Sequence, residues 1–162
     1  MNDYDPNRPQ ENQSAPAPEP VAKPKPSYDL DNFDTVAAAS VGAWLILRHP
    51  NTDEKLVGEN GPWRIQLLGN DSKKFKRAIS FEHEQAAKSR KKVMSLEKRD
   101  ESGINALAAI TLEFENIVMG EEIVSFSREN AIMLYTRFPW IKEQVDEFTA
   151  ERSNFLKSAP TS

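Results

Sequence analysis

Two histidines are the side chains best suited to proton transfer or metal binding at neutral pH. His49 stands directly before Pro50, where a turn is expected, and His83 lies between Glu82 and Glu84. Consecutive residues of a helix point in different directions, so the Glu-His-Glu run is not a ready catalytic pair. Neither histidine has the spaced cysteine, histidine or carboxylate partners of a metal site. We therefore interpret both as solvated side chains.

Motifs for nucleophilic chemistry and phosphate binding are absent from the sequence as well. No serine stands between the glycines of a nucleophile elbow. The 6 glycines are not grouped as in a phosphate-binding loop, and the chain has no cysteine for a disulfide or a thiolate. The sequence therefore predicts a protein that is not an enzyme and that uses no metal or other cofactor.

The densest charge is a basic run from Lys73 to Arg99. It holds ten basic and three acidic residues, a local charge of +7, so the rest of a chain of net charge -4 carries -11. Three interpretations stay open: a solvated face balanced by the chain's own acidic segments, a surface for an acidic protein, or a nucleic-acid site. Only Phe75 and Phe81 offer aromatic rings here, which argues against single-stranded nucleic acid. The basic residues expected to contact a partner are Lys73, Lys74, Lys76, Arg77, Arg90, Lys91 and Lys92.

Large aromatic side chains are the other candidate contact residues. Tryptophan beside a charged rim is typical of binding hot spots, and the chain has 3 tryptophans. We expect apolar patches around Trp44, Trp63, Phe138 and Trp140 to hold a partner. Each tryptophan can instead belong to the core, and we favour that interpretation for Trp44.

Composition divides the chain into an arm, a domain and a short tail. Seven of the 11 prolines lie at or before Pro26, and so few apolar residues accompany them that residues 1–31 are predicted to be a disordered arm. The arm is a docking peptide or, as we favour, a solubilising tail. Residues 32–158 are predicted to form a single α+β domain, followed by a flexible tail over 159–162.

Neither a membrane span nor a secretory signal is expected. The longest apolar runs fall short of the roughly 20 residues that cross a bilayer, and the first residues lack a charged start with an apolar stretch. With an isoelectric point near 5.3, the chain as a whole is not suited to nucleic acid or anionic membranes. The sequence therefore predicts a soluble, unexported protein.

Hydrophobic patterns place the first elements of the domain. Asp34 or Thr35 is expected to cap a helical turn over 36–39, and 43–48 and 63–68 are expected to pair as antiparallel strands. Residues 70–72 are a helix start, and the expected helix runs to about Arg99, with Gly103 as the break. For 104–115 we favour a second helix, although 110–115 also alternates like a strand.

The C-terminal third contains two strong helix starts. Residues 117–126 are expected to form a small hairpin, after which Ser127 is a credible N-cap and Pro139 suits the first turn of another helix. The apolar stripe of that last helix is expected to be Ile141, Val145, Phe148 and Phe155. The predicted fold is therefore α+β: a small antiparallel sheet packed with a long basic helix and a C-terminal helical pair.

Three segments resemble the tail assembly chaperones of long-tailed bacteriophages. They are residues 42–50 (Gly-Ala-Trp-Leu-Ile-Leu-Arg-His-Pro), residues 65–72 (Ile-Gln-Leu-Leu-Gly-Asn-Asp-Ser), and the block that runs from 126–131 (Phe-Ser-Arg-Glu-Asn-Ala) to Gln144 and Val145. The resemblance covers about residues 33–156. A proline-rich or variable start precedes these segments in the resemblance, although the family does not require a long proline-rich arm. None of the segments is a catalytic signature.

The resemblance implies a non-enzymatic protein of the host cytoplasm. Such a protein binds the tape-measure protein, recruits tail-tube subunits until they polymerise, and leaves before the virion is complete. Self-association is a further expectation, and the end of the sequence would fit the short product of a family that often makes a longer one by frameshifting. The alternative is a phage virion structural component, or a nucleic-acid-associated protein that uses the basic helix.

Overall fold

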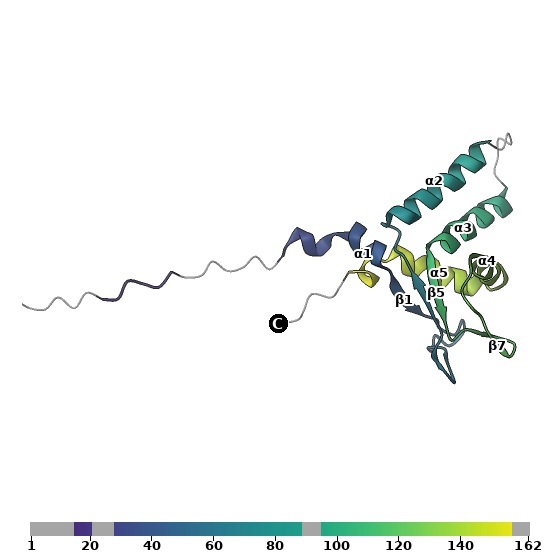
Figure 1. The fold of residues 1–162 in the computed structure, drawn as a ribbon, viewed down its shortest axis with the longest axis horizontal. Coiled ribbons are helices and arrows are strands. Elements are labelled where there is room, and N and C mark those ends of the chain that lie inside the picture. The colour runs from purple at the N-terminus through teal and green to yellow at the C-terminus, as the bar shows by residue number, and fades with distance from the viewer. Residues whose placement is uncertain (1–14, 21–27, 89–94, 157–162) are drawn as a thin grey trace, which may run out of the picture.

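A three-stranded antiparallel sheet stands at the centre of the fold (Figure 1). The computed structural model describes residues 15–20, 28–88 and 95–156. Within them β4 (Arg64–Leu67) lies between β1 (Ala43–Ile46) and β5 (Thr111–Glu115). The expected pairing of the first two segments is confirmed, with Leu45 opposite Ile65. β5 adds the third strand that a marginal pair needs.

One face of this sheet forms the core. Ile65 and Leu67 on β4 and Phe114 on β5 are buried, and they alternate with more exposed neighbours, as the two-residue period of a strand requires. Buried residues from three helices complete the cluster: Ile104, Leu107 and Ile110, then Ala131, Leu134 and Tyr135, then Ile141 and Val145. The fold is therefore mixed α and β, as the sequence predicts.

The segment before the sheet begins with a short 3-10 turn, η1 (Leu30–Phe33), and continues into α1 (Thr35–Val41). Asp34 caps α1, because its side chain accepts a 2.9 Å hydrogen bond from the backbone N–H of Ala37. Gly42 then turns the chain into β1 with a φ of 89°, which a residue with a side chain rarely adopts. Most of the expected arm, residues 1–14 and 21–27, lies outside the described residues, as does the expected tail over 159–162.

The prediction of one helix from 73 to about 99 is wrong. α2 (Lys73–Lys88) starts where expected, with Ser72 Oγ accepting from the N–H of Phe75. A new helix, α3 (Leu96–Ile110), begins at Ser95, whose extended backbone and side-chain bond to the N–H of Lys98 make it an N-cap. The two helices lie side by side and extend away from the sheet (Figure 1).

The expected break at Gly103 is also wrong, because this glycine lies inside α3. A glycine costs a helix about 1 kcal/mol, which burial of Ile104, Leu107 and Ile110 offsets. The favoured helix over 104–115 is correct only to Ile110, and the alternating stretch that follows is β5. Pairing with β4 decides the matter, because it places Phe114 opposite Ile65 in the core.

Two small two-stranded sheets complete the β structure. β2 (Val57–Gly58) pairs with β3 (Gly61–Pro62), and β6 (Val118–Met119) pairs with β7 (Glu122–Ile123). The second pair confirms the expected hairpin. Its turn contains Gly120 with a φ of 68°, a conformation that suits glycine.

Both predicted helix starts in the C-terminal third are confirmed. Ser127 caps α4 (Arg128–Arg137) by accepting a 3.0 Å bond from the N–H of Asn130, and Pro139 opens α5 (Pro139–Ala150). Three residues of the expected stripe lie on α5, but the fourth, Phe155, does not. Phe155 lies beyond α5, after the 3-10 turn η2 (Arg152–Asn154), where its ring contacts that of Phe148 at 5.6 Å between centroids.

Candidate protein-binding surface

The second face of the three-stranded sheet is the first candidate surface. Its side chains are those that alternate with the core residues, and they come from all three strands: Trp44, Ile46, Arg64, Gln66, Glu113 and Glu115. None of them is buried. The helices whose residues complete the core pack against the opposite face, so this outer face presents a mixture of apolar and charged groups to its surroundings.

Trp44 is held in place on this outer face by charged neighbours. The guanidinium of Arg64 lies 4.4 Å from the centroid of the indole, a distance at which a cation is attracted to the ring. The same guanidinium pairs with the carboxylate of Glu115 on β5. Both side chains of that pair are about one-third exposed, so its contribution to stability is at most about 1 kcal/mol. Its effect is to orient the cation over the ring.

The structure places Trp44 outside the core, contrary to the interpretation that we favour from sequence. Leu45 beside it packs against the core cluster, but Trp44 is not among the residues that do. The period of two in a strand explains this, because neighbouring residues face opposite sides of the sheet. An apolar run such as 43–47 does not by itself show which of its members face inward.

The other three aromatic candidates pack against the core and do not join Trp44 in one patch. Trp63, Phe138 and Trp140 are partly buried against the core cluster. Trp63 directs its indole N–H into the protein, where it has no hydrogen-bond partner among the described residues. A methyl group on Gly58 would lie 3.0 Å from this nitrogen. Phe138 lies at the junction of α4 and α5, with the guanidinium of Arg137 5.4 Å from its ring centroid.

The described residues of the basic run come from two helices, α2 and α3. Lys73, Lys74, Lys76 and Arg77 are exposed on the first turns of α2, and none of them is in an ion pair within the part of the chain that the structure describes. The other three predicted contact residues, Arg90, Lys91 and Lys92, lie outside the described residues. Lys98 and Arg99 belong to α3, next to Glu97, Asp100 and Glu101. The described basic residues of the 73–99 run are therefore divided between two helices.

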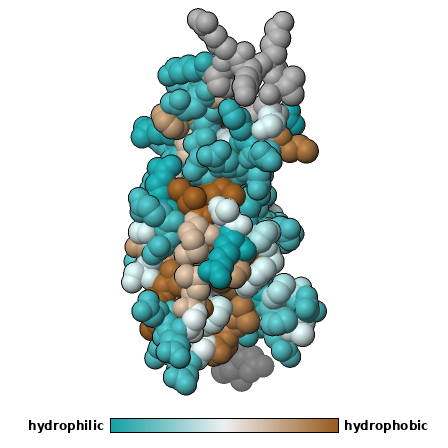
Figure 2. All heavy atoms as spheres, turned by 90° about the vertical axis from the view of Figure 1, so that its right-hand side faces the viewer, coloured by the Kyte–Doolittle hydropathy of each residue, from teal (hydrophilic) through white to brown (hydrophobic). Residues whose placement is uncertain are grey.

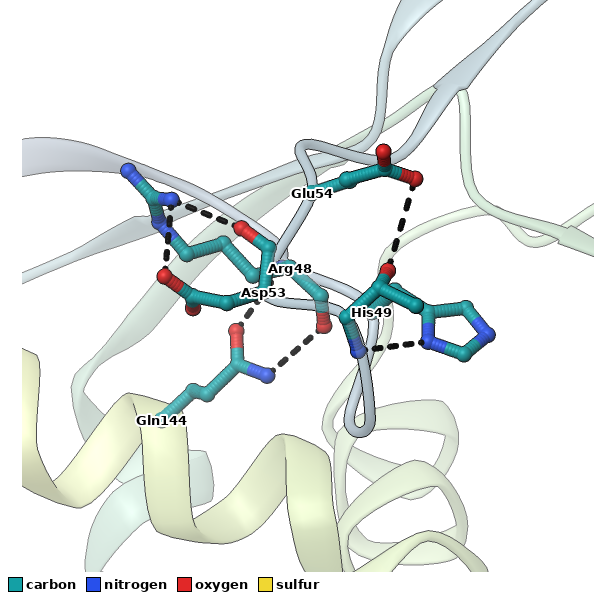
Figure 3. Close-up of polar contacts among 6 residues, drawn as sticks. Arg48, His49, Asp53, Glu54 and Gln144 are labelled. Carbon is teal, nitrogen blue, oxygen red and sulfur yellow. Dashed lines mark hydrogen bonds and ion pairs between the residues drawn. The ribbon is translucent and has the colours of Figure 1, made fainter.

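Gln144, 96 residues away in the sequence, bonds to the backbone just beyond β1. No pattern in the sequence predicts this contact. The side-chain amide of Gln144 on α5 accepts a 2.9 Å bond from the N–H of Arg48 and donates a 2.8 Å bond to its carbonyl (Figure 3). The amide thus takes the place of a peptide group on a neighbouring strand. On the other side of the loop, the Arg48 guanidinium bonds to the carbonyl and carboxylate of Asp53 (Figure 3).

Apolar side chains also gather on another side of the molecule. Figure 2 shows the side on which Figure 1 labels α4 and β7, and apolar atoms form a band down its middle, bordered by hydrophilic ones. On these elements Ile132 packs partly buried against the core, and Ile123 is 54 % exposed. Apolar surface is therefore not confined to the sheet.

The chemically capable residues of the described ranges serve in structural contacts or stay exposed. His49 Nδ1 accepts bonds from the N–H groups of Asn51 and Thr52 and so closes the turn after β1, while His83 is exposed on α2. Burial raises the pKa of the Tyr135 hydroxyl. Across residues 15–20, 28–88 and 95–156, no three histidine or acidic side chains are grouped to hold a metal ion.

No helix in the described ranges is both long and apolar enough to cross a bilayer. Comparison with models of known families, with curated proteins and with solved structures gives no match for this chain.

Proposed function

We propose that this protein is a non-enzymatic tail assembly chaperone of a long-tailed bacteriophage, which binds the tape-measure protein and recruits tail-tube subunits in the host cytoplasm. The observation that supports the proposal most directly is the position of Trp44. It lies outside the core on the outer face of the sheet, beneath the guanidinium of Arg64. An oriented tryptophan with a charged rim is the kind of residue that dominates binding energy in protein interfaces.

The mixed character of the outer face suits a partner that must later be released. Trp44 and Ile46 offer apolar contact, whereas Arg64, Glu113 and Glu115 keep the face hydrated when no partner is present. A chaperone needs affinity for unassembled subunits without forming a permanent, fully apolar interface. The exposed cations at the start of α2 add a second feature, attraction of an acidic partner from a distance.

The proposal is tested by co-expressing the protein with the tape-measure and tail-tube proteins of the same phage. Trp44→Ala is expected to weaken their capture at least about tenfold, because a hot-spot tryptophan contributes 2 kcal/mol or more. The matched control is Phe81→Ala, which removes another aromatic side chain, 55 % exposed, from α2. Equal losses in both variants, or no capture of either protein by the wild type at low salt, would contradict the proposal.

The alternative function rests on the four exposed cations at the start of α2. If they bind DNA, affinity for duplex or single strands must fall steeply as salt rises, with a slope set by the number of phosphates contacted. We expect no such binding, because Glu82 and Glu84 follow on the same helix and the chain as a whole is acidic. A stoichiometric band in purified virions would instead favour a structural component, since a chaperone leaves before the particle is complete.

A further inference from the structure

The outer edge of β1 carries peptide groups that no strand of the described residues pairs with. Ala43 lies opposite Leu67 and Leu45 opposite Ile65, and the N–H of Leu47 donates a 2.9 Å bond to the carbonyl of Trp63. In an antiparallel pair, alternate residues exchange hydrogen bonds with the neighbouring strand, and those between them point away. The N–H and C=O groups of Trp44, Ile46 and Arg48 therefore point away from β4.

Only part of this edge is occupied. Gln144 bonds to both backbone groups of Arg48. Within the described ranges β1 pairs with β4 alone, so the four backbone groups of Trp44 and Ile46 stay open. At the opposite edge of the sheet, the outward N–H of Phe114 is already bonded to the side chain of Glu113. Proteins commonly blunt their sheet edges, and within the described residues the backbone groups of Trp44 and Ile46 have no such partner.

Helix α5 supplies the chemistry beside the open edge. Gln144 bonds to Arg48, just after β1. Five residues later, the carbonyl of Thr149 accepts a bond from Asn70, which follows the end of β4 that pairs with the start of β1. Helix α5 therefore runs alongside β1. Glu147 follows Gln144 by three residues within α5, so the two lie on the same side of the helix, and Glu147 is exposed. The carboxylate of Glu147 therefore borders the edge on the inner side, and Trp44 and Ile46 border it on the outer side.

We propose that this edge binds an extended segment of a partner protein as a fourth strand, with basic and apolar side chains in alternation. Backbone bonds to Trp44 and Ile46 hold the segment, as in other cases of strand addition. Its alternate side chains point to opposite faces, so one set contacts Trp44 and Ile46, and the basic set meets Glu147. The inference states that the partner binds as an extended strand. It rests on the proposed function for the identity of that partner.

A different protein suits this edge better than a second copy or the chain's own arm. A second copy paired through the same edge would bring its own Glu147 into the neighbourhood of the first, and like charges repel. Seven of the 31 arm residues are proline, which has no N–H to donate. Charge complementarity therefore favours a basic strand from another chain.

The test uses two labelled probe peptides, one alternating lysine with valine and one alternating glutamate with valine. We expect the lysine peptide to bind the full-length protein and to slow hydrogen exchange at the amides of Trp44 and Ile46. The amides of Leu45 and Leu47 are expected to be protected with or without peptide, because they already bond to β4 and Trp63. Absence of new protection at Trp44 and Ile46 at saturating lysine peptide would overturn the proposal.

Two pairs of variants separate the backbone from the charge contribution. Ile46→Pro removes the outward N–H but leaves the β1–β4 ladder intact, as an edge strand tolerates, and it is expected to bind the peptide about tenfold more weakly than Ile46→Ala, which keeps the N–H. Glu147→Lys is expected to reverse the preference between the two peptides. Asp146→Lys, on the opposite side of α5, makes the same charge change and is expected to leave the preference unaltered.

These measurements separate the edge from the proposed function. Peptide-induced protection without capture of the tape-measure protein would keep the edge and refute the chaperone proposal. Capture of the tape-measure protein with equal loss in Ile46→Pro and Ile46→Ala would keep the chaperone proposal and refute strand addition.

Discussion

The buried hydroxyl groups of Thr111 and Tyr135 join the sheet to α4. They predict that replacing one of the two residues costs more stability than replacing the other. Their oxygens lie 2.7 Å apart, and Thr111 Oγ1 lies 2.9 Å from the carbonyl of Leu107. Because that carbonyl can only accept, Thr111 donates to it and Tyr135 donates to Thr111. Tyr135→Phe then removes one donor and leaves Thr111 bonded. Thr111→Val leaves the Tyr135 hydroxyl in the core without a partner.

The two substitutions are therefore expected to differ in cost. Tyr135→Phe should lower the free energy of unfolding by about 0.5 to 1.5 kcal/mol, the net value of one hydrogen bond. Thr111→Val should lower it by about 1 to 3 kcal/mol, because a buried hydroxyl loses water without gaining a partner. Urea unfolding followed by circular dichroism measures both, and an unchanged denaturant slope shows that the comparison is valid.

The double variant provides the control. With both hydroxyls replaced, no unsatisfied donor remains, so Thr111→Val combined with Tyr135→Phe should cost clearly less than the sum of the single changes. Additive costs, or a larger cost for Tyr135→Phe than for Thr111→Val, would refute the assigned direction of the hydrogen bonds.

Two further predictions concern pH and glycine. Burial raises the pKa of Tyr135 in the folded protein, so its contribution to stability is complete below the unfolded pKa of about 10 and is lost as pH rises above it; the alkaline loss of stability measured by urea unfolding should be smaller in Tyr135→Phe. Gly103→Ala should raise the free energy of unfolding by about 0.5 to 1 kcal/mol, because the position is helical and a methyl group there meets nothing within 4 Å. Gly42→Ala should instead destabilise the protein in the same assay, since Gly42 has a φ of 89° and a methyl group would lie 3.0 Å from Leu112; a stabilised Gly42→Ala would contradict the argument.

Local signals in the sequence were sufficient for several helix starts and for one strand pairing. Asp34, Ser127 and Pro139 start helices because a cap or a preset φ acts within three residues, and the structure has helices at all three. The pairing of β1 with β4 followed from two apolar segments separated by turn residues. The α+β class follows from these same local patterns.

Predictions failed where local preference and tertiary packing compete. Ser95 and Gly103 each offer a helix boundary, and only the first is used, because the residues after Gly103 are buried against the sheet. Residues 111–115 suit a helix or a strand, and the free hydrogen-bonding edge of β4 selects the strand. The local sequence around residues 111–115 gives no information about the edge of β4, which lies more than 40 residues earlier in the chain.

By itself, the sequence determined the fold class, the absence of familiar catalytic motifs, and the residues with the chemistry of a binding surface. Only the tertiary structure decided that Trp44 faces outward under Arg64, that the described part of the basic run is divided between α2 and α3, and that Gln144 bonds to the backbone of Arg48 beyond β1. The physical reason is distance along the chain. Caps and turns act between near neighbours, whereas Arg48 and Gln144 are 96 residues apart, and their contact exists only once the sheet and α5 have packed together.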